Sequence, residues 1–227
     1  MYVLILAAGR GERLRPLTDT TPKPLLRIGK YRLIEYHLHA LVAAGLVDIV
    51  INHAHLGQHI VSTIGNGSAY GARITYSAEP PGALETAGGI VKALPLLKTD
   101  PFAVINGDIW TDYPFERLPR DIPRLAHIVL VDNPAHNPAG DFVLSTDRVS
   151  ESKADTAGAA LTFSGIGIYR TALFSGLAPG RFPLAPVLKK AMANNQVTGE
   201  HYPGRWVDAG TPQRLAELDN ELSVAGC

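Results

Sequence analysis

The chain has 227 residues, of which 46% are hydrophobic and 19% charged, so it can bury a substantial core as one domain. Its 21 lysines and arginines balance 21 aspartates and glutamates, which excludes the strong positive field of proteins that bind nucleic acid or anionic lipid. The only cysteine is the last residue, Cys227, which excludes an internal disulfide and fits a reducing compartment.

The first predicted element is a short apolar strand at residues 3–7. It is too short to span a membrane, and it lacks the basic flank of a signal peptide. We therefore expect a cytoplasmic protein with no membrane or nucleic-acid partner, and the sequence leaves its oligomeric state open.

Strand-like apolar runs then alternate with helical patterns. The expected strands are apolar almost throughout, as strands buried on both faces are, and cover residues 3–7, 48–52, 73–77, 102–106 and 126–132. The expected helices between them cover residues 31–44, 56–64 and 86–97. This alternation predicts an α/β fold that is Rossmann-like and doubly wound, with a mainly parallel sheet and helices on both faces.

The rest of the chain is less regular. Further strands are expected at 141–145, 162–169 and 201–209, and a helix at 183–195. Thr211 and Pro212 supply an N-cap and a first-turn proline for a closing helix over 211–222. Because no repeat or clear linker interrupts the pattern, we expect a single domain over residues 1–227.

A loop rich in glycine and arginine follows the first strand. It lies where a buried strand ends, and open α/β sheets bind ligands at the carboxyl ends of their strands. Gly9 and Gly11 let backbone N–H groups approach an anion, while Arg13 and Arg15 supply guanidinium groups suited to phosphate. The loop lacks the third glycine of a dinucleotide fingerprint and the G-K-[ST] ending of a P-loop. We interpret it as a polyphosphate-binding loop, and a tight turn with solvated arginines is the alternative.

Lys23 lies between Pro22 and Pro24, which fix two backbone φ angles and make the segment stiff. We expect the lysine at a loop surface, directed at the same ligand. The alternative is a proline-rich turn with an exposed lysine.

Two aspartates are candidate metal ligands. Asp108 ends the tripeptide NGD (106–108), which follows the buried run FAVI at the same edge of the sheet as the opening loop, and Asp208 ends a strand-like segment before the closing helix. Carboxylates that share an ion with substrate phosphates are typical of Mg²⁺ sites. A turn aspartate or a helix cap is the alternative for each residue. The histidines His53, His55 and His59 have a metal-like spacing but no nearby cysteine, so we expect a helix start that lines or flanks the pocket instead.

Four motifs, L-A-A-G-x-G-x-R-L-x-P-L-T, T-P-K-P-L, N-G-D and W-x-D-x-G-T, follow in this order over residues 3–215. Together they resemble the sugar-1-phosphate nucleotidylyltransferases. The stretches NHAHLGQHI (52–60), LETAGGI (84–90) and LTFSGI (161–166) resemble one branch of that family, the N-acetylmuramate-1-phosphate uridylyltransferases of bacterial cell-wall recycling.

The resemblance implies a GT-A-like enzyme that transfers a uridylyl group from UTP to a sugar 1-phosphate and releases pyrophosphate. It implies Mg²⁺ as cofactor, UTP and a sugar 1-phosphate as partners, a nucleotide-binding half at about 1–132, and a sugar-binding half with the C-terminal helix at about 133–227. The alternatives are transfer to glucose, mannose or N-acetylglucosamine 1-phosphate, a metal-dependent glycosyltransferase that uses the aspartates of residues 108–112, and a non-catalytic relative. The last would have lost charged site residues, and none is lost.

The resemblance also implies residue roles. Arg13 would grip the triphosphate, Lys23 would bridge the α-phosphate and the sugar phosphate as the second catalytic residue, and Asp108 and Asp208 would hold Mg²⁺. The nucleotide-binding residues would be Leu6, Ala7, Ala8, Gly9, Gly11, Arg13, Lys23, Glu85, Thr86, Gly88 and Asn106.

The sugar side departs from the family pattern. Asn106, Gly140 and Glu151 would contact the sugar, although Glu151 has a solvated loop carboxylate as its alternative. Phe163 stands where the family has an asparagine, and Glu85 stands where it has a glycine near the base. The candidate partners for the lactyl carboxylate of N-acetylmuramate are Arg27, Lys153, Arg170 and Arg205.

Overall fold

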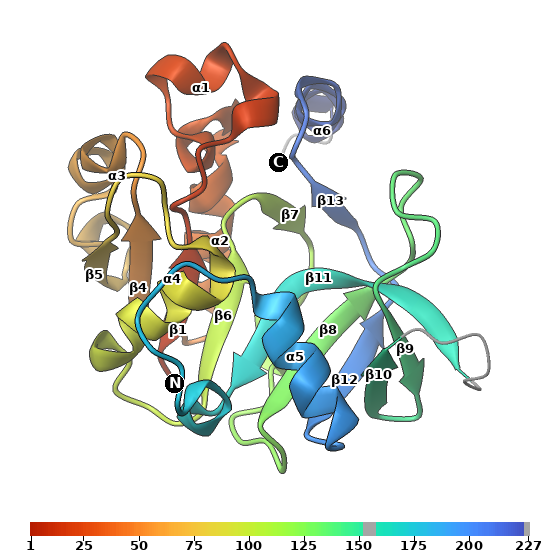
Figure 1. Ribbon diagram of the computed structural model, residues 1–227. Helices are drawn as coiled ribbons and strands as arrows, with labels where there is room; N and C mark the ends of the chain where they lie inside the picture. Colours follow the sequence, from red (N-terminus) through yellow and green to blue (C-terminus); the bar gives the residue numbers. More distant parts are fainter. Residues whose placement is uncertain (152–157, 225–227) are drawn as a thin grey trace.

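The computed structural model describes residues 1–151 and 158–224 (Figure 1). A nine-stranded sheet runs through the molecule in the order β5-β4-β1-β6-β11-β8-β12-β10-β9. These strands are β1 Val3–Leu6, β4 Asp48–His53, β5 Arg73–Ala78, β6 Phe102–Asn106, β8 Ala126–Val131, β9 Phe142–Ser145, β10 Arg148–Glu151, β11 Ala159–Tyr169 and β12 Val197–Tyr202. Two small two-stranded sheets accompany it, formed by β2 Arg27–Ile28 with β3 Tyr31–Arg32 and by β7 Ile109–Thr111 with β13 Trp206–Asp208.

The predicted α/β class is confirmed, and the sheet is mixed. Strands β5, β4, β1 and β6 are parallel to one another, as the alternating sequence pattern predicts. Strand β11 lies between β6 and β8 and runs antiparallel to both. Beyond it, β8 and β12 pair in parallel, and β10 and β9 continue the sheet in antiparallel pairs.

Helices cover both faces of the sheet (Figure 1). They are α1 Leu17–Thr20, α2 Leu33–Ala43, α3 Gly57–Ile64, α4 Glu85–Ala93, α5 Leu184–Ala193 and α6 Pro212–Val224. Because successive strand residues point to opposite faces, Val3 and Ile5 of β1 pack in one core with α2 and α3, while Leu4 packs in the other with α4 and α5. No helix in residues 1–151 and 158–224 is long and apolar enough to cross a membrane.

A third, smaller core joins the two ends of the chain. Leu14 of the opening segment and Trp110 of β7 pack there against Leu215, Leu218 and Leu222 of α6. The predicted cap of this helix is present, because the Arg214 N–H donates to the Thr211 hydroxyl over 3.3 Å. The C-terminal helix therefore packs beside the first loop of the protein.

Two predicted segments differ most from the structure, and one strand of the main sheet was not predicted. The single strand expected over 201–209 is wrong, because β12 ends at Tyr202 and β13 leaves the main sheet to pair with β7. Pro203 and Gly204 lie at this break, and proline cannot donate a ladder hydrogen bond. The helix expected over 86–97 ends at Ala93 and continues as a 3-10 turn that contains Pro95. Strand β10 was not predicted at all.

Candidate active site

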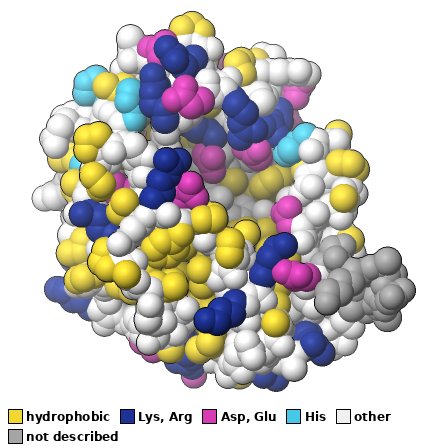
Figure 2. All heavy atoms as spheres, in the orientation of Figure 1, with side chains coloured by type: hydrophobic (Ala, Val, Ile, Leu, Met, Phe, Trp, Pro, Cys, Tyr) yellow, Lys and Arg dark blue, Asp and Glu magenta, His cyan; other side chains and the backbone are white. Residues whose placement is uncertain are grey.

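A cavity of about 310 Å³ opens where β1 and β6 end, and Figure 2 shows charged side chains along the upper wall of the corresponding hollow. The two strands leave the sheet side by side, because Leu6 and Asn106 are parallel neighbours and the Gly107 N–H donates to the Leu6 carbonyl over 2.8 Å. The lining residues are Leu6, Ala7, Ala8, Gly9, Gly11, Glu12, Arg13, Lys23, Pro24, Asn52, Glu79, Ala83, Glu85, Thr86, Asn106, Gly107, Asp108 and Gly210. Most of the predicted nucleotide-binding residues thus surround one space.

The opening loop is folded back on itself. Gly11 has a φ of +71°, which favours glycine, and an added Cβ would lie 2.9 Å from the Thr18 side chain. The Thr18 hydroxyl donates to the Gly11 carbonyl over 2.9 Å, and an Arg10 guanidinium N–H donates to the Thr18 carbonyl over 2.7 Å. Arg13 lines the cavity, whereas Arg15 is exposed and paired with Asp19 at 2.9 Å. Of the two arginines that the sequence proposed for phosphate, only Arg13 faces this space.

Lys23 is buried, so the expectation that it lies at a loop surface is wrong. Its side chain is only 8% exposed, and its Nζ lies 2.9 Å from Oδ2 of Asp108, which is 43% exposed. A 3-10 turn begins at Lys23 and is held by the hydrogen bond from the Leu26 N–H to the Lys23 carbonyl. The ammonium is therefore held in place beside the cavity, in a setting where charge interactions are stronger than in bulk water.

Strands β7 and β13 bring the two candidate metal ligands together. Asp208 is the antiparallel partner of Ile109, the residue after Asp108, and the Ala209 N–H donates to the Asp108 carbonyl over 3.1 Å. Asp208 lies beside the cavity next to the lining residue Gly210. No group of three or more His, Cys, Asp or Glu side chains forms a complete metal site within the described ranges. Two carboxylates nevertheless fit Mg²⁺, which takes its remaining ligands from water and substrate phosphates.

A chain of hydrogen bonds that no sequence pattern predicted crosses the cavity wall. The Ala7 N–H donates to Oδ1 of Asn52 over 2.6 Å, and Nδ2 of Asn52 donates to Oε1 of Glu79 over 2.6 Å. The other Glu79 oxygen accepts the Leu84 N–H over 2.7 Å. Asn52 is only 2% exposed, so its amide holds the opening loop to the loop before α4. The available signal was position, since Asn52 lies near the end of a predicted buried strand.

The start of α4 forms another part of the wall. Glu85 and Thr86 line the cavity, and Glu85 has a φ of +59°, a conformation in which glycine is favoured and which explains the glycine expected here. The Glu85 carboxylate pairs with Arg181 at 3.1 Å. Gly88 does not line the cavity. It contacts the backbone at Gly180, where an added Cβ would collide with the carbonyl oxygen.

A sequence model of the nucleotidyl transferase family matches residues 2–144. The chain belongs to this family. It is 52% identical over 96% of both chains to the N-acetylmuramate alpha-1-phosphate uridylyltransferase of Neisseria meningitidis serogroup B, and 31% identical to the enzyme of that name from Caulobacter vibrioides, over 98% of this chain and 97% of the other. The inositol-1-phosphate CTP transferase of T. maritima shares the fold, with a TM-score of 0.78 at 16% identity, over 97% of this chain and 95% of that one.

In this nucleotidyl transferase, two of the residues proposed for the sugar do not line the cavity. Gly140, with φ +68°, packs against Asn133 and the backbone of Leu161. Glu151 ends β10 and pairs with Lys189 of α5 at 3.5 Å. The third, Asn106, does line the cavity, and its side chain packs on Gly165 in β11, where an added Cβ would lie 2.6 Å from its Nδ2.

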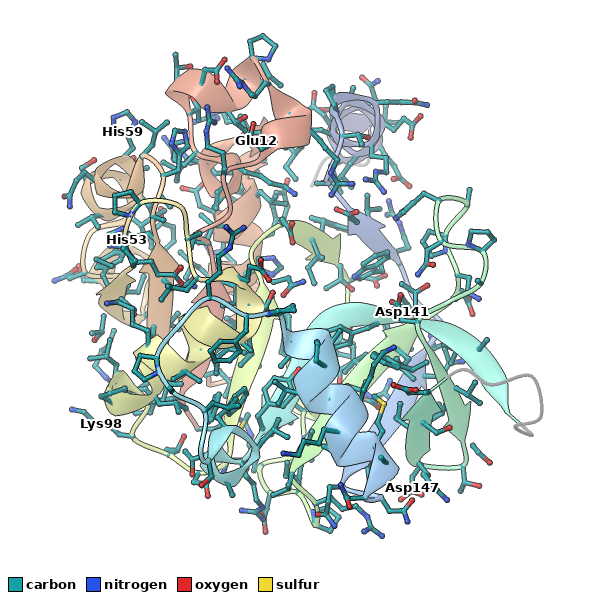
Figure 3. The ribbon with its side chains drawn as sticks, viewed as in Figure 1. Glu12, His53, His59, Lys98, Asp141 and Asp147 are labelled. Carbon is teal, nitrogen blue, oxygen red and sulfur yellow. The ribbon has the colours of Figure 1, made fainter. Side chains whose placement is uncertain are left out.

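Phe163 lies in β11, and its backbone N–H donates to the Asp141 carboxylate over 2.9 Å. Figure 3 places Asp141 near β11, below and to the right of Glu12 of the opening segment. The side chain of Phe163 packs against the core that contains α4 and α5. It therefore contributes apolar surface where the family pattern has an amide.

Three of the four candidate cations for a lactyl carboxylate do not line the cavity. Arg170 pairs with Asp121 at 2.7 Å and lies 4.0 Å from Asp100. Asp100 precedes β6, so this group lies at the opposite end of that strand from the cavity. Arg205 pairs with Glu221 and lies over the Trp110 ring. Arg27 is exposed on β2 and does not line the cavity, and Lys153 lies outside the described residues.

The three histidines flank the site without lining it. His55 contacts the Thr18 carbonyl at 3.0 Å through Nε2 and so supports the opening loop. His53 is buried against Gly57, and burial lowers the pKa of its imidazole. His59 is exposed on α3, as Figure 3 shows.

Proposed function

We propose that this nucleotidyl transferase joins the uridylyl group of UTP to N-acetylmuramate 1-phosphate, which yields UDP-N-acetylmuramate and pyrophosphate. The observation that carries the activity is the meeting of Lys23, Arg13 and the Asp108 carboxylate around one cavity at the carboxyl ends of β1 and β6. The names of the two similar enzymes support the choice of uridylyl donor and of sugar.

The reaction needs positioning and charge neutralisation more than acid–base chemistry. An oxygen of the sugar phosphate attacks the α-phosphorus of UTP, and the bond to the oxygen that bridges the α- and β-phosphates breaks. Pyrophosphate leaves with that electron pair. The nucleophile is already an anion at neutral pH, so no residue has to remove a proton. Catalysis then depends on holding two mutually repelling anions in line.

Lys23 is placed to do this. Its buried ammonium is fixed by Asp108 on one side and borders the cavity on the other, so it can contact phosphate oxygens without first becoming ordered. Arg13 can bind the β- and γ-phosphates through its planar fork, and the turn at Gly9 and Gly11 brings backbone N–H groups near them. Asp108 and Asp208 would hold Mg²⁺, which neutralises phosphate charge when it is bound.

The Asn52–Glu79 chain has a supporting role in this proposal. It connects the loop after β1, which carries the phosphate-binding residues, to the loop before α4, which carries the residues expected near the base. Because Asn52 is buried and both of its amide atoms are hydrogen-bonded, the spacing of these two loops is set before a nucleotide binds.

The test is pyrophosphate release in a panel of N-acetylmuramate, N-acetylglucosamine, glucose and mannose 1-phosphates against UTP, dTTP, CTP and GTP with Mg²⁺. We expect N-acetylmuramate 1-phosphate with UTP to exceed N-acetylglucosamine 1-phosphate by at least ~10-fold in kcat/KM. Equal or reversed preference would refute the muramate assignment alone. No pyrophosphate from any pair, or release of UDP to a sugar acceptor, would refute the nucleotidyl transfer itself.

A further inference from the structure

Three charged side chains from distant parts of the sequence meet at Gly210, which lines the cavity. A Cβ atom added to Gly210 would lie 2.6 Å from Oδ1 of Asp208, 2.8 Å from Nη2 of Arg13 and 2.9 Å from Nη2 of Arg214. Arg13 belongs to the opening segment and Arg214 to the first turn of α6. The absence of a side chain at Gly210 therefore lets two guanidinium groups and one carboxylate share this space.

Positive charge is in excess at this point. Nη2 of Arg214 lies 3.1 Å from Oδ2 of Asp208, and its Nε lies 3.3 Å from the Thr211 hydroxyl. Nη1 of Arg214 is buried and donates to no group among residues 1–151 and 158–224. Within the same residues Arg13 forms no ion pair. A buried donor without a partner is unfavourable, so the Arg214 guanidinium retains unused capacity to bind an anion.

Packing holds both arginines near the cavity. Leu14, next to Arg13, and Leu215, next to Arg214, belong to the same small core with other leucines of α6. Figure 1 shows α6 beside the opening segment that carries α1, above β7 and β13. Thr211 caps the first turn of α6 and contacts the guanidinium of Arg214 as well. The two guanidinium groups are thus carried on elements that pack against each other.

We propose that Arg214 is a polyphosphate-binding residue, which acts with Arg13 on the β- and γ-phosphates of the nucleotide and on the pyrophosphate that leaves. This rests on the proposed function. Two neighbouring guanidinium forks suit two neighbouring phosphate groups, because each fork can donate two parallel N–H bonds to one anion. Asp208 orients Arg214 through their ion pair, which explains why a candidate metal ligand has an arginine beside it.

The test compares Arg214→Gln with wild type by titration calorimetry with UTP and Mg²⁺ and no sugar phosphate, so that no turnover occurs. We expect the Kd of UTP to rise by about 10- to 100-fold, which is the range for losing hydrogen bonds to a charged group. The Kd of UMP should change by less than about 3-fold, because UMP lacks the β- and γ-phosphates. A merely structural role of Arg214 would weaken both ligands alike.

Arg214→Lys and Gln213→Ala complete the design. Lysine keeps the charge but lacks the planar fork, so Arg214→Lys should weaken UTP by a smaller factor than Arg214→Gln, with UMP unchanged. Gln213 lies on the same turn, and within the described residues its side chain hydrogen-bonds only to the exposed Glu217, at 2.9 Å. Gln213→Ala should therefore bind UTP as wild type does.

Unchanged UTP affinity in Arg214→Gln, or equal losses for UTP and UMP, would overturn the assignment. If Arg214→Gln does not fold, Arg214→Lys decides between the same outcomes. A wild-type protein that binds no UTP would refute the proposed function before Arg214 is tested.

Discussion

The buried position of Lys23 separates two consequences of replacing it. Lys23→Ala removes three methylenes from a side chain that is only 8% exposed, at about 0.8 kcal/mol each, so we expect the free energy of unfolding to fall by about 2 kcal/mol. Lys23→Met keeps an unbranched apolar stem and should lose less than about 1 kcal/mol. Asp108 adds little to either cost, because it is 43% exposed and stays hydrated when its partner is removed.

Turnover should respond differently, because both variants lose the ammonium. We expect kcat to fall by about 100- to 1,000-fold in each, as when one preorganised charge donor is removed from an active site. Urea unfolding measures the stability and pyrophosphate release measures the turnover. Lys98→Met is the matched control, since Lys98 is exposed and Figure 3 shows it far from the opening segment. Near-normal turnover in Lys23→Met would remove Lys23 from the mechanism, and an unchanged stability of Lys23→Ala would refute the burial argument.

Two further predictions concern the metal and pH. Asp108→Asn should lose at least about 100-fold of the Mg²⁺-dependent activity, because an amide is a poor ligand for a hard cation. Asp112→Asn should respond to Mg²⁺ like wild type, because the Asp112 carboxylate accepts hydrogen bonds from the Tyr202 hydroxyl and the Arg205 N–H. A wild-type Mg²⁺ titration for Asp108→Asn would contradict the first expectation. Burial lowers the pKa of His37 from its ordinary 6.5 to about 4, so the folded protein favours the neutral imidazole. This contribution to the free energy of unfolding is fully present above pH 6.5, and about 3 kcal/mol of it is lost as the pH falls from 6.5 to 4. When the pH is lowered from 7 to 5, the midpoint of urea unfolding should therefore fall further in wild type than in His37→Leu. Equal falls in the two proteins would contradict the burial effect.

Part of the site could be predicted because its signals are local in sequence. The runs at 3–7 and 102–106 are apolar throughout, which indicates strands buried on both faces, and the loops that follow them therefore had to share one edge of the sheet. Asn106 and the opening loop meet there as predicted. The cap at Thr211 could also be predicted, because a capping hydroxyl acts on backbone groups only three residues away.

Other features depend on pairings that no local pattern contains. The apolar sequence of β11 says that the strand is buried, but not that it enters between β6 and β8 in the antiparallel direction. Lys23 likewise has its ion-pair partner, Asp108, 85 positions along the chain, and no local pattern around a lysine between two prolines predicts that pairing.

The two aspartates show the same division most clearly. Each could be recognised as a carboxylate at the end of a strand, yet their proximity comes from the pairing of β7 with β13, two three-residue strands about 100 positions apart. Arg214 had no recognisable motif, because its significance lies in the approach of Arg13 and Asp208 across Gly210. Motif chemistry is carried by neighbouring residues and can be read along the chain, whereas charge balance at a site is a sum over side chains that only the folded backbone brings within a few ångströms.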